Sequence, residues 1–107
     1  MDCWSLLIGA RKVRAKSRRF SRADDRCIQE ITTRHFPDGF TILHALGGWL
    51  DPGRRQFVKE ESRQVLICGA NGRAVRRWAL ELGRALRQKE IVVLRLGTAL
   101  RLRIRPD

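Results

Sequence analysis

The sequence predicts a single α+β domain, residues 1–107, of the ferredoxin-like βαββαβ class. Short apolar runs and two segments of helical periodicity follow one another in the order strand, helix, strand, strand, helix, strand. A length of 107 residues fits one domain, and a hydrophobic content of 43% supplies the apolar residues for one core. In this class two helices cover one face of an antiparallel sheet. The other face is then left to solvent, a ligand, nucleic acid or a second subunit.

The first half of the chain gives a strand, a helix and a second strand. The apolar run over residues 3–10 is short and ends in glycine and a basic segment, which is typical of a buried strand. Ser21 is a good N-cap, and apolar residues then recur at helical spacing, so we expect a helix over about 22–34. The turn signals of Phe36-Pro37-Asp38-Gly39 end it and lead into a strand over about 40–46.

The second half begins with a turn and a strand and continues into the clearest helix of the sequence. Asp51-Pro52-Gly53 predicts a turn, after which residues 54–60 form a short hairpin arm. The β-branched, apolar run over 64–69 predicts a central strand, and Asn71 is the expected N-cap of the helix that follows. One apolar stripe at helical spacing defines that helix: Val75, Trp78, Ala79, Leu82 and Leu86.

Residues 91–104 alternate between apolar and polar side chains, as in a half-buried strand. A single strand of that length would reach nearly 50 Å at ~3.3 Å per residue, which exceeds a small domain. We therefore expect a bend, bulge or hairpin at Gly97-Thr98, with an extra C-terminal strand as an option.

The charge is strongly basic, since 23 Lys and Arg against 11 Asp and Glu give +12, and 19 of the 23 are arginine. Half of this charge is local: residues 11–26, including a basic loop over about 11–21, carry a net +6. Such a segment is either a solvated loop or a phosphate-binding patch. The candidate anion or nucleic-acid contacts are Arg11, Lys12, Arg14, Lys16, Arg18, Arg19 and, at the start of the second helix, Arg73.

The three cysteines, Cys3, Cys27 and Cys68, are far apart in sequence and form no CxxC pair. Their odd number and apolar surroundings predict free thiols that pack as small hydrophobes in a reduced compartment. No run approaches the ~20 apolar residues of a membrane span, and the start lacks the pattern of a signal peptide. We therefore expect a cytoplasmic protein with no membrane span.

Two-thirds of the chain, from Thr33 to about Leu102, resembles an uncharacterised bacterial family catalogued only as a domain of unknown function. The pieces that carry the resemblance are Phe36-Pro37-Asp38-Gly39-Phe40-Thr41, Gly48-Trp49, Glu61-Ser62, and Arg87-Gln88 with Glu90. Members typically read Gln-Glu-Ser before the last strand, whereas Lys89 separates Gln88 from Glu90 here and no serine follows. The resemblance implies a small ferredoxin-type domain and assigns no activity.

Few side chains suit catalysis. Glu61, at the mouth of the apolar sheet, is either a general base or a turn carboxylate paired with arginine, and His44 is either a base or a structural histidine. Trp49 is a candidate pocket wall. The ligand-binding residues that we predict are Trp49, Ser62, Gln88 and Glu90. Metal-ligand spacings and a phosphate loop are absent, so we predict no metal and no cofactor, and the sequence does not decide whether the protein is an enzyme.

Two functions are compatible with these features. The first is a small oligomeric domain, a dimer through its sheet, that binds a small ligand between sheet and loops. The second is an adaptor for nucleic acid or an acidic partner that acts nonspecifically through residues 11–26. The stacking aromatics of the common βαββαβ RNA-binding module are missing from the strand over 64–69, which favours the first.

Overall fold

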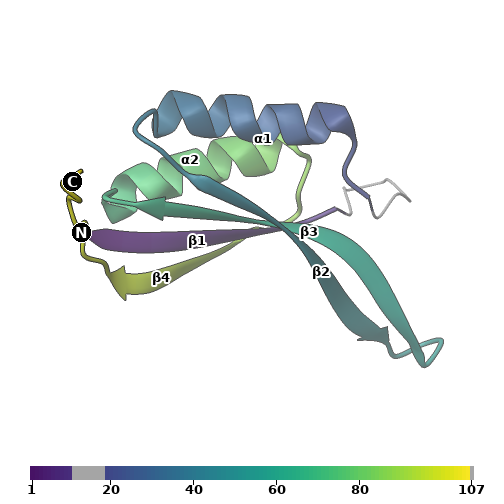
Figure 1. Cartoon of the computed structure of the whole chain (residues 1–107). Helices are drawn as coiled ribbons and strands as arrows, with labels where there is room; N and C mark the ends of the chain where they lie inside the picture. Colours follow the sequence, from purple (N-terminus) through teal and green to yellow (C-terminus); the bar gives the residue numbers. More distant parts are fainter. Residues whose placement is uncertain (11–18, 107) are drawn as a thin grey trace.

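The predicted element order is confirmed by a computed structural model, which describes residues 1–10 and 19–106. The elements are β1 (Asp2–Gly9), α1 (Arg22–His35), β2 (Thr41–Asp51), β3 (Gln56–Cys68), α2 (Gly72–Ala85) and β4 (Val92–Thr98). The strands form one antiparallel sheet in the order β2-β3-β1-β4, the ferredoxin-like topology. Both helices lie on one face of this sheet, so its opposite face is open (Figure 1). The predicted fold class is therefore correct.

Side-chain caps fix where each helix begins. Ser21 and Asp24 form a capping box: the Asp24 amide donates to Ser21 Oγ at 3.0 Å, and the Ser21 amide donates to Asp24 Oδ2 at 2.9 Å. Asn71 caps α2 by accepting from the Ala74 amide at 2.9 Å. Both caps stand where the sequence predicts them.

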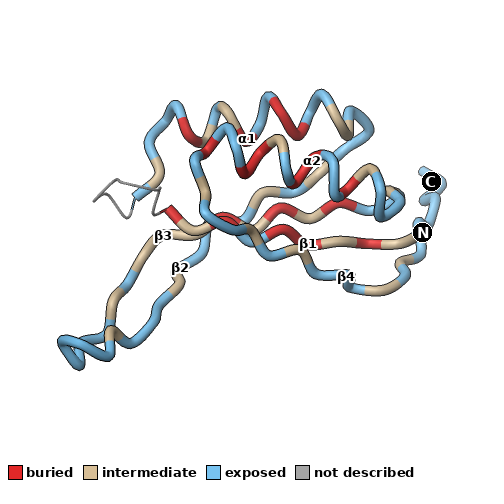
Figure 2. The backbone as a smooth tube through the Cα atoms, turned by 180° about the vertical axis from the view of Figure 1, so that it is seen from behind, coloured by how far each residue is buried: buried red, intermediate tan, exposed pale blue. Residues whose placement is uncertain are grey.

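The core lies between the sheet and the two helices, where Figure 2 shows the buried positions gathering. Leu6 and Ile8 of β1 and Val65 and Ile67 of β3 alternate toward the helices, as period-two strands require. The apolar stripe of α2 completes this layer. Trp78 is fully buried, and its Nε1 donates to Thr32 Oγ1 of α1 at 3.0 Å, so the two helices are joined by a hydrogen bond inside the core.

The hairpin of β2 and β3 is longer than expected. The structure joins the predicted arm over 54–60 and the strand over 64–69 into one strand, β3, and extends β2 to Asp51. The two strands pair without interruption from Thr41↔Leu66 to Asp51↔Gln56. Their distal half projects beyond the helices as an arm (Figure 1), and the molecule is accordingly elongated, 57 × 27 × 24 Å. Both faces of this arm are exposed to solvent, so apolar and polar side chains need not alternate along its strands.

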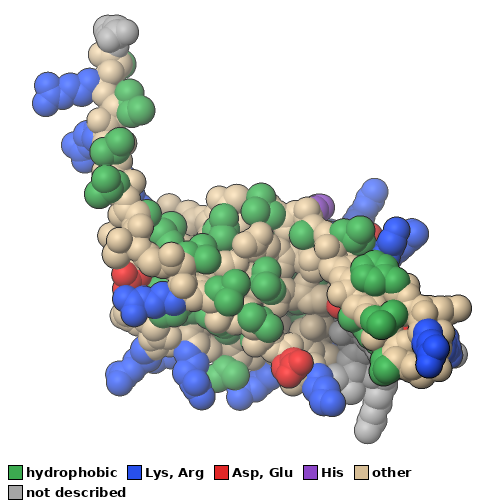
Figure 3. Space-filling view, turned by 90° about the horizontal axis from the view of Figure 1, so that it is seen from below, with side chains coloured by type: hydrophobic (Ala, Val, Ile, Leu, Met, Phe, Trp, Pro, Cys, Tyr) green, Lys and Arg blue, Asp and Glu red, His purple; other side chains and the backbone are tan. Residues whose placement is uncertain are grey.

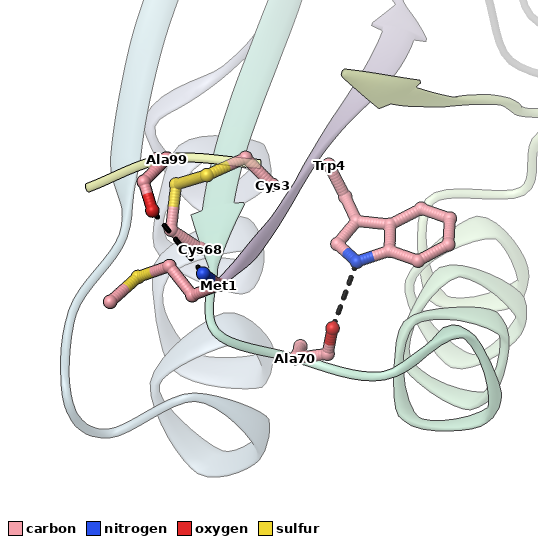
Figure 4. The surroundings of a disulfide bond; sticks show 6 residues. All are labelled: Met1, Cys3, Trp4, Cys68, Ala70 and Ala99. Atoms are coloured by element: carbon pink, nitrogen blue, oxygen red, sulfur yellow. Dashed lines mark hydrogen bonds between the residues drawn. A yellow bond between two sulfur atoms is a disulfide. The ribbon is translucent and has the colours of Figure 1, made fainter. Parts of the chain in front are cut away.

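The expectation of three free cysteines is wrong for two of them. Cys3 and Cys68 form a disulfide between β1 and β3, shown in Figure 4. The two residues are direct partners in the antiparallel register, with 4.1 Å between their Cα atoms, so the pairing of the strands brings the thiols together. Cys27 forms no disulfide. The cysteine argument for a reduced compartment therefore loses its basis.

The last strand ends at the predicted bend. Gly97 has φ +112°, and the register of β4 against β1 shifts between Cys3 and Trp4, which marks a bulge. The optional fifth strand does not form. Residues 99–106 contain no strand, and the chain leaves the sheet after Ala99. Among the helices of the described chain, none is long and apolar enough to cross a membrane.

Candidate functional site

A cavity of about 480 Å³ lies on the open face of the sheet, between the base of the β2–β3 arm and the loop from α2 to β4. Figure 3 views this open face and shows hydrophobic side chains gathered over it and along the arm, with basic side chains mostly at the periphery. The cavity is lined by Leu7, Ile8, Gly9, Gly47, Gly48, Trp49, Glu60, Ser62, Gln88, Lys89, Glu90 and Val92. All four predicted ligand-binding residues are in this set. These four residues come from β2, β3 and the loop between α2 and β4, which are separate in the sequence.

Glycines make the space on the strand side of the cavity. A Cβ at Gly9 would lie 2.8 Å from Oε1 of Glu60, so the carboxylate lies directly over this position of β1. A Cβ at Gly47 would meet ordinary contacts, with the backbone oxygen of Glu60 at 3.7 Å. At Gly48 a Cβ would lie 2.1 Å from the Phe57 ring. A side chain at Gly9 or Gly48 would therefore displace Glu60 or Phe57, whereas a methyl group at Gly47 would meet only ordinary contacts.

The loop side of the cavity is held by the end of α2. Arg87 adopts a left-handed conformation with φ +53°, and the Gln88 amide donates to the Gly83 carbonyl at 2.9 Å, which ends the helix. The Gln88 side chain donates to the Leu86 carbonyl at 3.3 Å. These bonds position Lys89 and Glu90 at the cavity.

Sequence reasoning missed Glu60 and Lys89. Strand periodicity could have found Glu60, because it lies two residues before Ser62 and therefore on the same face of β3. The cavity holds two carboxylates, Glu60 and Glu90, and one ammonium, Lys89. These three are the charged side chains among the described residues that line the cavity.

The two predicted catalytic candidates lie on the opposite face. Glu61 Oε2 accepts from the Phe20 amide at 2.8 Å and lies 3.9 Å from Nη2 of Arg63. Arg63, 5% exposed, is also paired with Asp25 of α1 at 2.9 Å. Glu61 therefore anchors the entry to α1, in line with the alternative of a carboxylate paired with arginine. His44 is exposed and pairs in register with Arg63, so neither candidate lines the cavity.

The described part of the basic segment does not form a common surface with Arg73. Arg11, Lys12, Arg14, Lys16 and Arg18 lie outside the described residues. Arg19 precedes Phe20, which binds Glu61 beyond the end of β1. Arg73 follows Gly72, which approaches Trp4 near the beginning of β1. The two arginines are exposed at opposite ends of this strand.

The Glu81 carboxyl, whose pKa is shifted, lies outside the cavity. Hydrogen bonds from Arg34 and His35 lower the pKa of Glu81, and the same contact raises the pKa of Arg34. The distances are 2.6 Å from Arg34 Nη2 and 3.1 Å from His35 Nε2. This cluster joins α1 to α2. No group of three His, Cys, Asp or Glu residues in the described ranges could hold a metal ion.

Fold and site together define a small ferredoxin-like domain with a cavity on the uncovered face of its sheet. Residues 5–93 match the family model described as "Protein of unknown function (DUF3574)". The chain belongs to this family, as its turn residues indicate. No curated protein matches the sequence.

Solved structures with a similar fold include a phage SAM lyase in two states. In complex with S-methyl-5'-thioadenosine, the lyase has a TM-score of 0.61 and 17% identity, with 91% of this chain and 82% of the lyase covered. The apo state gives a TM-score of 0.63 and 16% identity with the same coverage. At this level of identity the similarity establishes the fold alone.

Proposed function

We propose that this protein binds a small organic ligand in the cavity on the open face of its sheet. The observation that carries the proposal is the convergence of Trp49, Glu60, Ser62, Gln88 and Glu90 on one cavity of about 480 Å³. This volume is within the range of ligand sites, and a few polar groups among apolar ones are typical of such sites. Trp49 offers a ring face against which a planar group can stack.

The described lining offers hydrogen-bonding groups of several kinds to such a ligand. Glu60 and Glu90 supply carboxylate acceptors, Ser62 a hydroxyl and Gln88 an amide. A thioether nucleoside combines a planar base with hydrogen-bonding hydroxyls, and SAM adds a sulfonium cation to the same frame. Since the phage lyase of similar fold is named for SAM and was solved with S-methyl-5'-thioadenosine, we take these two compounds as the ligand class to test.

Replacing Trp49 with alanine is expected to weaken binding of both compounds about 10- to 100-fold, because stacking on an aromatic side chain contributes ~1–3 kcal/mol per base. Isothermal titration calorimetry measures this change. Leu50→Ala is the matched control, since Leu50 is the next residue of β2, is 63% exposed and does not line the cavity. Glu60→Gln separates the two ligands, because losing the carboxylate should weaken SAM more than the neutral thioether.

Absence of binding by the wild-type protein, or equal weakening by Leu50→Ala, would reject the cavity as the site for this ligand class. RNA binding that falls steeply between low and moderate salt would instead assign the function to the arginines. Such a salt slope is independent of Trp49, so the two results are distinguishable.

We further propose that a second copy covers the open face and so closes the cavity. Leu7, Leu43, Val92 and Leu94 are 38–49% exposed on this face, and an uncovered apolar patch around a cavity is typical of an interaction site. Leu43→Glu is expected to weaken the association made through this face, which sedimentation over a range of concentrations measures. Leu46→Glu, on the other face of β2 and 67% exposed, should leave the dimer intact. A wild-type monomer across the micromolar range would contradict this arrangement.

A further inference from the structure

The C-terminal segment is an amphipathic extended chain without a place in its own sheet. Leu100, Leu102 and Ile104 are 88%, 76% and 86% exposed. They alternate with Arg101, Arg103 and Arg105, so one side of an extended segment is apolar and the other is basic. Figure 3 shows the segment projecting from the body with its apolar and basic side chains in solvent. Three large apolar side chains in this state favour burial against a partner.

Pairing with the free edge of its own sheet would cost the segment part of its length. Ala99 is held beside the beginning of β1, because its amide donates to the Met1 carbonyl at 2.8 Å and its carbonyl accepts from the Met1 amino group at 3.2 Å (Figure 4). These bonds lie on the inner side of β4. To pair with the outer side of β4, the chain after Ala99 would first have to turn back, which uses residues of the alternating segment itself.

The outer edge of β4 offers a fitting site. β4 is an end strand of the described sheet, so its outer backbone groups are available for pairing. Beside it, between β4 and α2, runs an apolar groove of about 370 Å³. The groove is lined by Trp4, Gly72, Val75, Arg76, Ala79, Leu80, Ile91 and Val93. Leu80 is 44% exposed there, so the groove is apolar and uncovered.

We propose that the C-terminal segment of a second copy adds as a strand to the outer edge of β4. Backbone bonds to the edge supply affinity, and alternate side chains enter the groove, as in other cases of strand addition. In this arrangement Leu100, Leu102 and Ile104 face the groove, and the arginines project from the opposite side of the added strand, away from Arg76. Because the segment directly follows β4, two copies can exchange their segments reciprocally, which gives a closed pair. None of the residues that line this groove lines the ligand cavity.

Mixed cysteine variants test which surfaces meet. In a Cys27→Ser background, one copy carries Leu102→Cys in the segment and the other carries Leu80→Cys in the groove. Mild oxidation of the mixture is expected to yield the cross-linked pair as the main product. A copy with Leu43→Cys, on the open face, is the matched control and should cross-link far less. Equal cross-linking to both partners, or none to Leu80→Cys, overturns the proposal.

Association itself is tested by two triple variants of the segment. Substitution of Leu100, Leu102 and Ile104 by serine is expected to weaken this association at least about 100-fold, because each loses buried apolar surface. Substitution of Arg101, Arg103 and Arg105 by serine should retain it. Sedimentation velocity reads both, and the exposed position of the segment leaves folding intact. If the apolar variant associates as the wild type does while Leu43→Glu dissociates, self-association belongs to the open face and the strand-addition proposal fails.

Discussion

Replacing both Cys3 and Cys68 with serine is expected to lower the free energy of unfolding by about 4 kcal/mol. The disulfide joins residues 65 positions apart, so it removes a large loop-closure entropy from the unfolded chain. For a domain of this size the loss corresponds to a fall in melting temperature of roughly 15–30 °C. Thermal and urea unfolding, with and without a reductant, measure it. Reductant should destabilise the wild type and leave the double serine variant unchanged.

The matched control is Cys27→Ser, which removes the thiol outside the disulfide and leaves the disulfide in place. We expect it to keep most of the wild-type stability and its sensitivity to reductant. A wild-type protein whose melting temperature is the same with and without reductant would contradict the prediction. It would mean that the two cysteines are not joined in the folded protein. Pairing of β1 with β3 would then hold their Cα atoms 4.1 Å apart without a covalent bond.

The outcome for the cysteines shows which part of the fold was readable from sequence. Element order follows from local patterns, such as the cap at Ser21 and the apolar stripe of α2, and these were predicted correctly. A disulfide between Cys3 and Cys68 depends on the register of two strands that are distant in sequence. No local pattern carries that register, so the thiols were assigned to the core separately.

The sequence predicts two separate strands, over 54–60 and 64–69, where the structure has the single strand β3, and the reason for this difference is another one. Glu60, Glu61 and Arg63 interrupt the apolar pattern and suggest the end of one strand and the start of another. In the structure this is the stretch where β3 passes from the covered sheet into the exposed arm. Strand pairing continues there through the backbone, which side-chain patterns do not report.

The cavity was partly readable. Trp49, Ser62, Gln88 and Glu90 stood out because turns and a family resemblance drew attention to them, and the fold places them together. Glu61 stood out for the same reason, but the alternation of β3 turns it toward α1 and turns its neighbour Glu60 toward the cavity. A shift of one residue therefore decides which carboxylate faces the cavity.

Replacing Trp78 with alanine is expected to cost about 3–5 kcal/mol of unfolding free energy, comparable to loss of the disulfide. Trp78 is fully buried between the helices and the sheet, and its ring meets Phe36 edge-on with centroids 5.3 Å apart. Truncation leaves a cavity in the centre of the core. Chemical denaturation measures the loss, with Leu80→Ala as the control, because Leu80 is on the same helix and 44% exposed.

A milder pair of variants isolates the hydrogen bond inside this core. Thr32→Val removes the hydroxyl that accepts from Trp78 Nε1 at 3.0 Å and leaves the indole N–H buried without its partner, a loss of about 1–3 kcal/mol. In the background of Trp78→Phe no such donor remains, so the same Thr32→Val change should cost much less. Equal costs in both backgrounds would show that the hydrogen bond contributes nothing to stability. A smaller cost in the Trp78→Phe background would show that the hydrogen bond between Thr32 and Trp78 itself stabilises the contact of α1 with α2.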